Sequence, residues 1–385
     1  MRRLFPLVAA VILVDTMFYA AITPLLPEYA DDHGLSKTAA GILSASYAAG
    51  TLLAALPSGW LATRIGFRAT MLAGLGLLAG SSVVFAFADG IVILDLARFA
   101  EGVGGACAWT GGLAWLIAAA PADRRGEVIG SALAAAIFGI LLGPVIGGIA
   151  TVTGPEVVFC GVAVIASVLA ALVFARTGAP PPTPASLRQV VGSIFRGPVL
   201  IAFWLVALPS ILAGTLDVLV PLRMDALGAS GVAVGVAFFA SAGVEALISP
   251  SMGRLSDRRG RMTPIRVGLV ASAFAALLLP LPAGVLLLAV VLLGAVLAMS
   301  LLWTPATALL SDNAEIAGLD LAFATALVSL AWAGGQVFGG SAVAGLADAT
   351  SDGVAYALIA AGFGLTLAAF ALRRRAAAGG LRQSA

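Results

Sequence analysis

The sequence predicts an all-helical membrane protein, with twelve transmembrane helices in two pseudo-symmetric halves of six helices each. Apolar residues make up 61% of the 385 residues, charged residues make up only 10%, and the mean hydropathy is +1.08. A soluble protein carries about 25% charged residues. Apolar runs of about 20 residues, enough to cross a hydrocarbon core about 30 Å thick, recur along the chain. Two motifs also occur twice at nearly equal spacing, which indicates two related halves.

The apolar runs set the number of membrane crossings and the topology. They cover residues 5–26, 39–62, 69–88, 91–118, 128–150, 157–175, 199–220, 231–252, 264–281, 284–310, 321–346 and 353–372. Twelve crossings place both termini on the same side. Of the 21 Lys and Arg residues, 18 fall on that side, Lys37 and Arg223 fall on the other, and Arg98 lies within a run. Because positive residues concentrate in cytoplasmic loops, we expect a multi-pass protein of the cell (inner) membrane with both termini in the cytoplasm.

A proline-rich connection divides the chain. Residues 179–184 read APPPTP, and such a segment forms a stiff linker rather than a helix. We therefore expect an N-terminal six-helix half over 1–176, a cytoplasmic linker over 177–198, a C-terminal half over 199–372 and a basic cytoplasmic tail over 373–385.

The two halves share sequence motifs. The segment Gly59–Gly66 (GWLATRIG) recurs 194 residues later as Gly253–Gly260 (GRLSDRRG). The segment Gly143–Gly148 (GPVIGG) recurs less closely, 192 residues later, as Gly335–Gly340 (GQVFGG). In transporters built from related halves, the substrate site lies at their interface near the middle of the membrane.

Asp15 is the most informative single residue, because it lies in the middle of the first apolar run. A charged side chain at that depth costs about 2.5–3.5 kcal/mol on insertion scales. The carboxylate must therefore face an aqueous cavity, pair with a cation or hold a proton, and all three fit a proton-coupled carrier of cations. Asp217 lies in the seventh run, closer to the outer end, and we expect it to act with Asp15.

Four motifs, in order and on the expected runs, make the chain resemble the major facilitator superfamily over nearly its whole length. The loop at 59–68 looks like the superfamily's signature loop, and Leu94-x3-Arg98-x3-Gly102-x-Gly104 looks like the motif that supplies an intramembrane arginine. The segment 139–148 looks like the signature of drug:proton antiporters. Asp15 followed by Pro24 and Pro27 is similar to the first helix of those antiporters, and especially of the vesicular amine transporters.

The resemblance implies roles for two groups of residues. The antiporter signature is implied to suppress leak, and its residues here are Gly139, Gly143, Pro144, Gly147 and Gly148. The two related loops are implied to gate the cytoplasmic side, through Gly59, Thr63, Arg64, Gly66 and Arg68 in the first half and Gly253, Asp257, Arg258 and Gly260 in the second.

The chain departs from the family pattern at three positions. Thr63 stands where the signature loop has an acid, which the second copy keeps as Asp257, so we expect a weaker lock of the outward-open state. A threonine hydroxyl still accepts hydrogen bonds from a helix N-terminus but adds no charge to the helix dipole. Ser300 and Ser329 stand where vesicular amine transporters carry acids, so monoamine specificity is not expected here.

Further polar residues within the runs are candidates for the site. Asp95, Arg98 and Glu101 follow at i, i+3 and i+6 on one helix face, and we expect Arg98 to control whether a cavity carboxylate is ionised or protonated. Glu245 in the eighth run is either a proton carrier or a protonated hydrogen-bond donor. Tyr19 lies one turn from Asp15 and suits an organic cation through cation–π attraction.

These observations predict a secondary transporter, not an enzyme, that exports lipophilic or cationic small molecules in exchange for protons by alternating access. Proton-coupled uptake of a metabolite and a non-transporting sensor or scaffold remain as alternatives. An ATP-driven pump is excluded for the single chain, because the phosphate-binding loop G-x4-G-K-[S/T] is missing from the sequence. With His33 as the single histidine, we expect neither a metal centre nor a cofactor. The expected partners are a small molecule, protons and membrane lipid, with no nucleic acid, and we expect a monomer.

Overall fold

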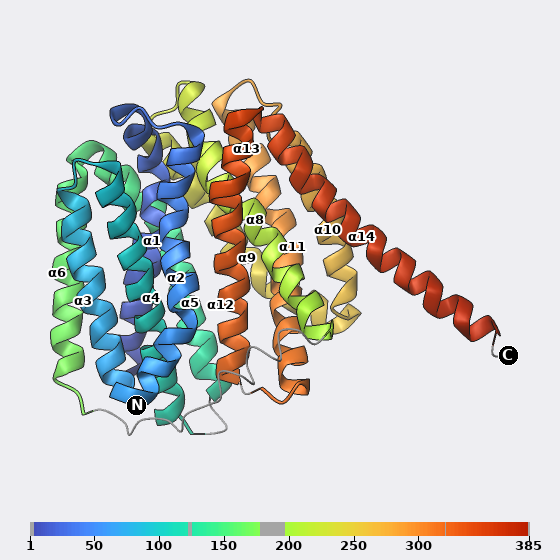
Figure 1. Ribbon diagram of the computed structural model, residues 1–385, viewed down its shortest axis with the longest axis horizontal. Helices are drawn as coiled ribbons and strands as arrows, with labels where there is room; N and C mark the ends of the chain where they lie inside the picture. The colour runs from blue at the N-terminus through green and yellow to red at the C-terminus, as the bar shows by residue number, and fades with distance from the viewer. Residues whose placement is uncertain (1–3, 122–124, 178–196, 320, 384–385) are drawn as a thin grey trace.

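The computed structural model describes residues 4–121, 125–177, 197–319 and 321–383, and within these ranges it leaves out the side chains of 125–129, 250, 255, 257, 321–323 and 373–383. The chain is helical throughout the described ranges (Figure 1). The first half consists of α1 (Leu4–Asp32), α2 (Lys37–Ile65), α3 (Phe67–Ala86), α4 (Ile91–Ala119), α5 (Arg125–Thr153) and α6 (Pro155–Phe174). The second half consists of α8 (Gly197–Ala226), α9 (Gly231–Arg259), α10 (Met262–Leu278), α11 (Val285–Ile316), α12 (Leu321–Val337), η2 (Phe338–Val343), α13 (Ala344–Ala349) and α14 (Asp352–Gln383).

The helices confirm the predicted all-helical fold with twelve crossings. Because α12, the π-helical segment η2 and α13 follow one another without a break, they form a single crossing. Ten helical segments of the described chain are long and apolar enough to span a membrane, and α10 is a shorter apolar helix. The predicted proline-rich linker falls on residues 178–196, which lie outside the described residues.

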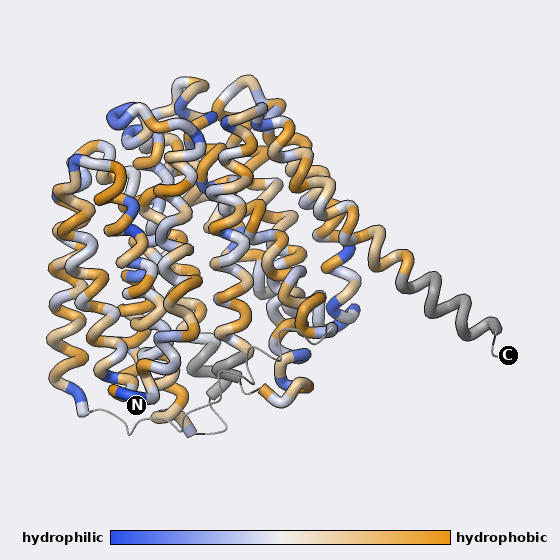
Figure 2. Tube along the Cα trace, viewed as in Figure 1, coloured by the Kyte–Doolittle hydropathy of each residue, from blue (hydrophilic) through white to orange (hydrophobic). Residues whose placement is uncertain are grey.

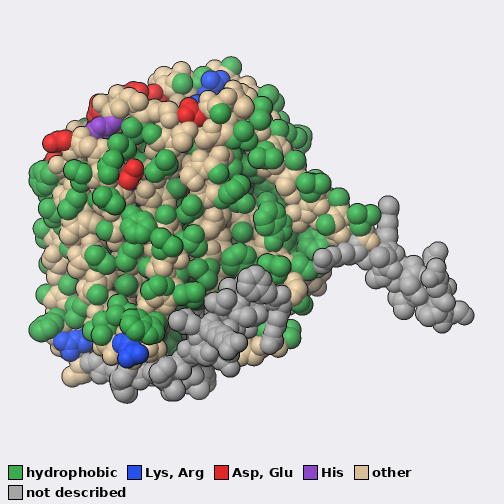
Figure 3. Space-filling view, in the orientation of Figure 1, with side chains coloured by type: hydrophobic (Ala, Val, Ile, Leu, Met, Phe, Trp, Pro, Cys, Tyr) green, Lys and Arg blue, Asp and Glu red, His purple; other side chains and the backbone are tan. Residues whose placement is uncertain are grey.

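The two ends of the bundle differ in charge. The end where α1 stops at Asp32 carries exposed acidic side chains, and we refer to it as the acidic end (Figure 3). The opposite end, where α2 stops at Ile65 and α3 begins, carries Arg64 and Arg68, and we refer to it as the basic end. Between the ends, hydrophobic residues predominate along the helices (Figure 2), and apolar side chains are spread over the face seen in Figure 3. This band is the surface expected to meet lipid.

The repeated loop motif has the same backbone conformation in both halves. Gly66 ends α2 with φ 84° and ψ 161°, and Gly260 ends α9 with φ 77° and ψ 149°. Only glycine adopts such positive φ values at no steric cost, which explains why both copies place glycine there. The sequence repeat is thus also a structural repeat.

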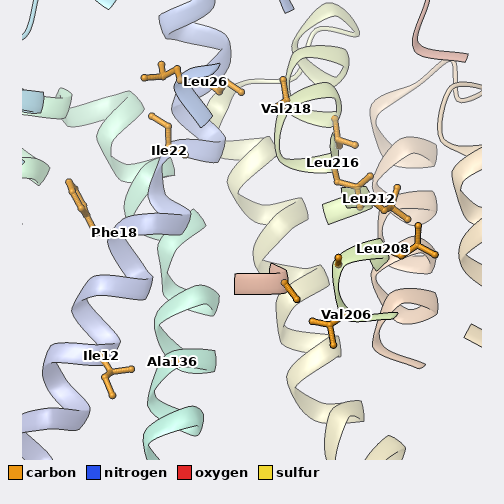
Figure 4. Packing of buried hydrophobic residues seen from close by; sticks show 14 of the residues in the cluster. Ile12, Phe18, Ile22, Leu26, Ala136, Val206, Leu208, Leu212, Leu216 and Val218 are labelled. Carbon is orange, nitrogen blue, oxygen red and sulfur yellow. The ribbon is translucent and has the colours of Figure 1, made fainter. Parts of the chain in front are cut away.

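Helices α1 and α8 are largely enclosed by the rest of the bundle. In their most apolar windows, 61% of the α1 residues and 67% of the α8 residues are buried. Figure 4 shows Phe18 and Ile22 of α1 and Leu212 and Leu216 of α8 among the buried apolar side chains. Asp15 and Asp217 therefore lie on the two central helices. The halves meet where α1 packs on α8, α2 on α12 and η2, and α5 on α9.

Candidate functional site

Asp15 is fully buried, and its carboxylate is held by side chains from two other helices. Its Oδ2 atom accepts hydrogen bonds from the Tyr47 hydroxyl on α2 (3.0 Å) and from Trp109 Nε1 on α4 (3.0 Å). Among the described residues, its Oδ1 atom has no hydrogen-bond partner. A buried acceptor without a partner costs about 1–3 kcal/mol, more when it is charged. This oxygen is therefore poised to take a proton or to contact a cation.

Gly105 provides the space for this arrangement. A Cβ atom at this position would lie 2.6 Å from the Tyr47 hydroxyl and 2.7 Å from Asp15 Oδ1, closer than real Cβ contacts allow. Gly105 is not among the residues predicted from the sequence. The signal for it is the adjacent pair Gly104-Gly105 in the run that carries Arg98, because small residues mark close helix packing in membranes.

Arg98 and Glu101 form a buried ion pair next to α1. Arg98 Nη1 lies 2.9 Å from Glu101 Oε2, and both side chains are only 1% exposed. The guanidinium also donates to the main-chain carbonyls of Phe18 (3.4 Å) and Tyr19 (3.0 Å), and it lies 5.4 Å from the centroid of the Tyr47 ring. Arg98 thus fixes α4 against the α1 backbone just beyond Asp15.

Within the expected series of Asp95, Arg98 and Glu101, the structure pairs Arg98 with Glu101. Asp95 is only half-buried, and its buried Oδ1 has no partner among the residues described. Arg98 instead directs its two Nη atoms to Glu101 and to α1, because α1 offers carbonyl acceptors on that side. The cluster is therefore an ion pair anchored to a helix backbone.

Tyr19 connects the two halves through Asp217. Its hydroxyl donates to Asp217 Oδ2 on α8 (3.3 Å) and accepts from Gln336 Nε2 on α12 (2.9 Å). The sequence places Tyr19 one helical turn from Asp15, but its hydroxyl bonds the other aspartate. Its ring lies 4.9 Å from the Tyr47 ring and 5.4 Å from the Trp332 ring, measured between centroids. Aromatic faces therefore lie between the two carboxylates.

Glu245 lies apart from these contacts. It is half-buried on α9, and its Oε1 accepts a hydrogen bond from Ser300 Oγ on α11 (2.9 Å). Both of its roles left open by the sequence, proton carrier and hydrogen-bond donor, stay predictions.

The antiporter-like segment of α5 has two packing faces. Gly139, Gly143 and Gly147 follow at intervals of four residues and pack directly on α1, where a methyl group at any of them would overlap α1 atoms. Pro144 and Gly148 face α9 of the other half instead. A Cβ at Gly148 would lie 3.7 Å from Val232, and one at Gly235 would lie 2.7 Å from the Pro144 carbonyl oxygen. The motif thus joins the helix of Asp15 to the second half.

The loop motifs lie at the basic end. The Thr63 hydroxyl donates to the Trp60 carbonyl within its own helix (2.7 Å). Arg64 lies over the Trp60 ring (5.3 Å), and Arg68 lies over the Phe174 ring (5.0 Å). In the second copy, Arg258 is exposed and the loop glycines Gly253 and Gly260 are described, whereas the Asp257 side chain lies outside the described residues.

At the acidic end, polar contacts hold α2 to the second half. Lys37 Nζ lies 2.5 Å from Asp352 Oδ1, and the Thr38 hydroxyl donates to Asp348 Oδ2 (2.7 Å). The Thr38 amide points to the same oxygen (3.4 Å), so Asp348 helps to cap the N-terminus of α2 from the other half. The sequence does not predict these contacts, because their partners lie 315 and 310 residues apart in the chain. They hold the two halves together at the acidic end in this conformation.

Comparisons with known proteins agree with this architecture. The family model of the Major Facilitator Superfamily matches residues 8–335 and 218–384. A probable vesicular acetylcholine transporter-B of Danio rerio is 35% identical over 162 residues, which is 38% of this chain and 32% of that protein. The matches to the first curated relatives span about a third of the length of those proteins.

Two solved structures share the fold over nearly the full chain. A bacterial homologue of the human lysosomal transporter Spinster, in an inward-facing and occupied conformation, superposes with a TM-score of 0.75 at 15% identity and covers 97% of both chains. A D-xylose–proton symporter superposes with a TM-score of 0.70 at 18% identity, over 94% of this chain and 95% of that one. At such identities these structures show the fold alone. Together with the family match, they show that this multi-pass membrane protein belongs to the major facilitator superfamily.

Proposed function

We propose that the protein is a proton-coupled secondary transporter that exports lipophilic, cationic small molecules by alternating access. The observation that carries this proposal is the fully buried carboxylate of Asp15, with one oxygen held by Tyr47 and Trp109 and the other without a partner. A proton and an organic cation both satisfy that oxygen, and they exclude each other. Exchange then follows without contact between the two ligands.

The surroundings of Asp15 favour an organic cation over other small molecules. The Tyr47 ring, whose hydroxyl bonds Asp15, lies close to the Tyr19 ring, which in turn contacts Trp332; aromatic faces attract desolvated cations by about 2 kcal/mol or more. Relatives named vesicular acetylcholine transporters support the same class, because acetylcholine is a quaternary ammonium ion. We expect a substrate that combines one positive charge with an apolar body.

The charge count of the site is compatible with exchange. The buried acids Asp15 and Glu101 and the partly buried Asp217 share one fixed cation, Arg98, so the fully ionised cluster is negative. An uncompensated net charge in a low-dielectric interior is unfavourable, so the cluster favours binding of either protons or a cation. If two protons enter for each monovalent cation, the membrane potential adds about 2.3 kcal/mol per 100 mV, whereas one proton adds none.

Alternating access requires each end to close in turn. The contacts of Lys37 and Thr38 with the second half close the acidic end, which the charge pattern assigns to the outside. We propose that the basic end, with its two related loops, is the cytoplasmic gate, and that the membrane is the cell (inner) membrane.

The test uses everted membrane vesicles that contain the protein, an imposed inside-acid pH gradient and a pH-sensitive dye. Cationic, neutral and anionic compounds are added to the wild type, to Asp15→Asn and to the matched control Asp89→Asn, an exposed loop residue. We expect proton release for cations alone, unchanged in Asp89→Asn and lost in Asp15→Asn. Absence of release for every compound, with the protein shown to be folded, would refute antiport and favour uptake or a sensor role. Release that persists in Asp15→Asn would move the proton site to Asp217 or Glu245.

A further inference from the structure

Gln336 contacts one partner of the hydrogen bond that connects α1 and α8. Its side chain is buried (6% exposed), and its Nε2 donates to the Tyr19 hydroxyl at 2.9 Å. Its Oε1 lies over Gly214 of α8, where a Cβ atom would come within 2.7 Å of it. Gln336 is therefore held in place between α12, α1 and α8.

These contacts determine the direction of the central hydrogen bond. An amide NH₂ group only donates, so the Tyr19 oxygen acts as the acceptor for Gln336. The single hydroxyl hydrogen of Tyr19 is then free to go to Asp217, at 3.3 Å. An ionised carboxylate only accepts hydrogen bonds. Every group in the trio is satisfied as long as Asp217 is ionised.

Protonation of Asp217 weakens this hydrogen bond, because a neutral carboxyl oxygen is a weaker acceptor than an ionised one. The reverse arrangement, in which the carboxyl hydrogen is donated to the Tyr19 oxygen, competes with the bond that this oxygen already accepts from Gln336. Of the neighbouring groups, Arg98 of α4 donates to the Tyr19 main-chain carbonyl, and Tyr47 of α2 touches Tyr19 through its ring.

We propose that Gln336 is a positioning residue that fixes the direction of the Tyr19–Asp217 hydrogen bond, so that the contact between α1 and α8 holds while Asp217 is ionised and loosens when Asp217 is protonated. Because α1 and α8 belong to different halves, the contact among Tyr19, Asp217 and Gln336 couples the protonation state of Asp217 to the interface between the halves. The inference rests on the proposed function only in that Asp217 exchanges protons during transport.

The experiment measures the distance between the acidic ends of α1 and α8 as a function of pH. Spin labels are placed at the exposed positions Asp32→Cys and Ala226→Cys of the full-length protein, and the distance distribution is recorded by double electron–electron resonance between pH 8 and pH 5. The variants are Gln336→Met and Gln336→Glu, which have a similar size but lack the amide donors, together with Tyr19→Phe and the double variant Tyr19→Phe/Gln336→Met. Ser341→Ala is the matched control, because its hydroxyl bonds within its own helical segment.

In the wild type and in Ser341→Ala, we expect the ratio of long to short distances to rise at least threefold as the pH falls. Both Gln336 variants should lose most of this rise, and the double variant should behave as Tyr19→Phe does. A wild-type pH response in Gln336→Met and Gln336→Glu, or effects of Gln336 and Tyr19 that add in the double variant, would overturn the proposal. Cys107 and Cys160 are first replaced by Ala in all samples, so that only the introduced sites carry labels.

The vesicle assay separates this proposal from the proposed function. A distance change that depends on both pH and Gln336, in a protein that shows no cation-evoked proton release, would support the positioning role and refute antiport. Normal antiport combined with a response that is indifferent to Gln336 would refute the positioning role alone. Size-exclusion profiles show whether each variant is folded, and the Gln336→Glu variant provides the result if Gln336→Met is not.

Discussion

Replacing Gly105 with alanine tests whether close packing of α4 on the Asp15 carboxylate is required for binding. The added Cβ would lie 2.6 Å from the Tyr47 hydroxyl and 2.7 Å from Asp15 Oδ1, which is 0.4 and 0.3 Å inside the 3.0 Å limit of real Cβ contacts. At least one of the two groups must move away. Because the Tyr47–Asp15 hydrogen bond is already 3.0 Å long, a shift of this size weakens or breaks it.

The structure gives a magnitude for this effect. A hydrogen bond to a charged group contributes about 1.5–3 kcal/mol, which corresponds to roughly a 10- to 150-fold change in an equilibrium constant. We therefore expect Gly105→Ala to raise the Kd of a transported cation by one to two orders of magnitude. The Kd is measured by calorimetry on the purified protein, with the cation that evokes the strongest proton release in vesicles.

The matched control is Gly76→Ala on α3, where nothing lies within 4 Å of an added Cβ. It should bind the cation as the wild type does, and both variants should keep a thermal midpoint close to that of the wild type. A Kd for Gly105→Ala within threefold of the wild-type value would refute the reasoning, because it would mean that the Asp15–Tyr47 contact does not contribute to binding.

Three further predictions follow from the packing and charge contacts. Gly143→Val should lower the thermal midpoint and abolish transport, because the added side chain overlaps α1, whereas Gly148→Ala should be nearly neutral, because its added Cβ lies 3.7 Å from the nearest atom. Thermal melts and the vesicle assay compare the two variants, and equal effects would contradict the description of two packing faces on α5. Asp348→Asn weakens the contact with Thr38 and should raise the rate of cysteine labelling at the acidic end about threefold, because an exposed polar contact contributes about 0.2–1 kcal/mol. An unchanged labelling rate would show that this contact does not hold the acidic end closed. Arg98→Met leaves Glu101 buried without its partner and should lower the free energy of unfolding by about 3–5 kcal/mol. The yield of purified protein should therefore fall sharply in this variant and recover in Arg98→Met/Glu101→Met. A fully folded single variant would refute the pairing.

The sequence alone was sufficient for the fold and for several site candidates. The lengths of the apolar runs predicted the twelve crossings, because a membrane helix satisfies its own backbone and must cross a fixed thickness of hydrocarbon. Asp15 and Arg98 stood out because an ionisable residue within such a run is costly wherever its helix packs. The motif glycines at 66 and 260 indicated the repeat, and their matching positive φ values reflect a requirement of the local backbone. All of these properties are local in the chain.

The partners of the candidate residues were decided by the tertiary structure. Tyr47 and Trp109 reach Asp15 from 32 and 94 residues away, Tyr19 reaches Asp217 from 198 residues away, and Gln336 reaches Tyr19 from 317 residues away. Helical periodicity predicts which residues share a face of one helix, but it does not predict which helix that face meets or at what height. These depend on how closely the helices approach and how each is rotated, which small residues such as Gly105 set through packing with distant helices.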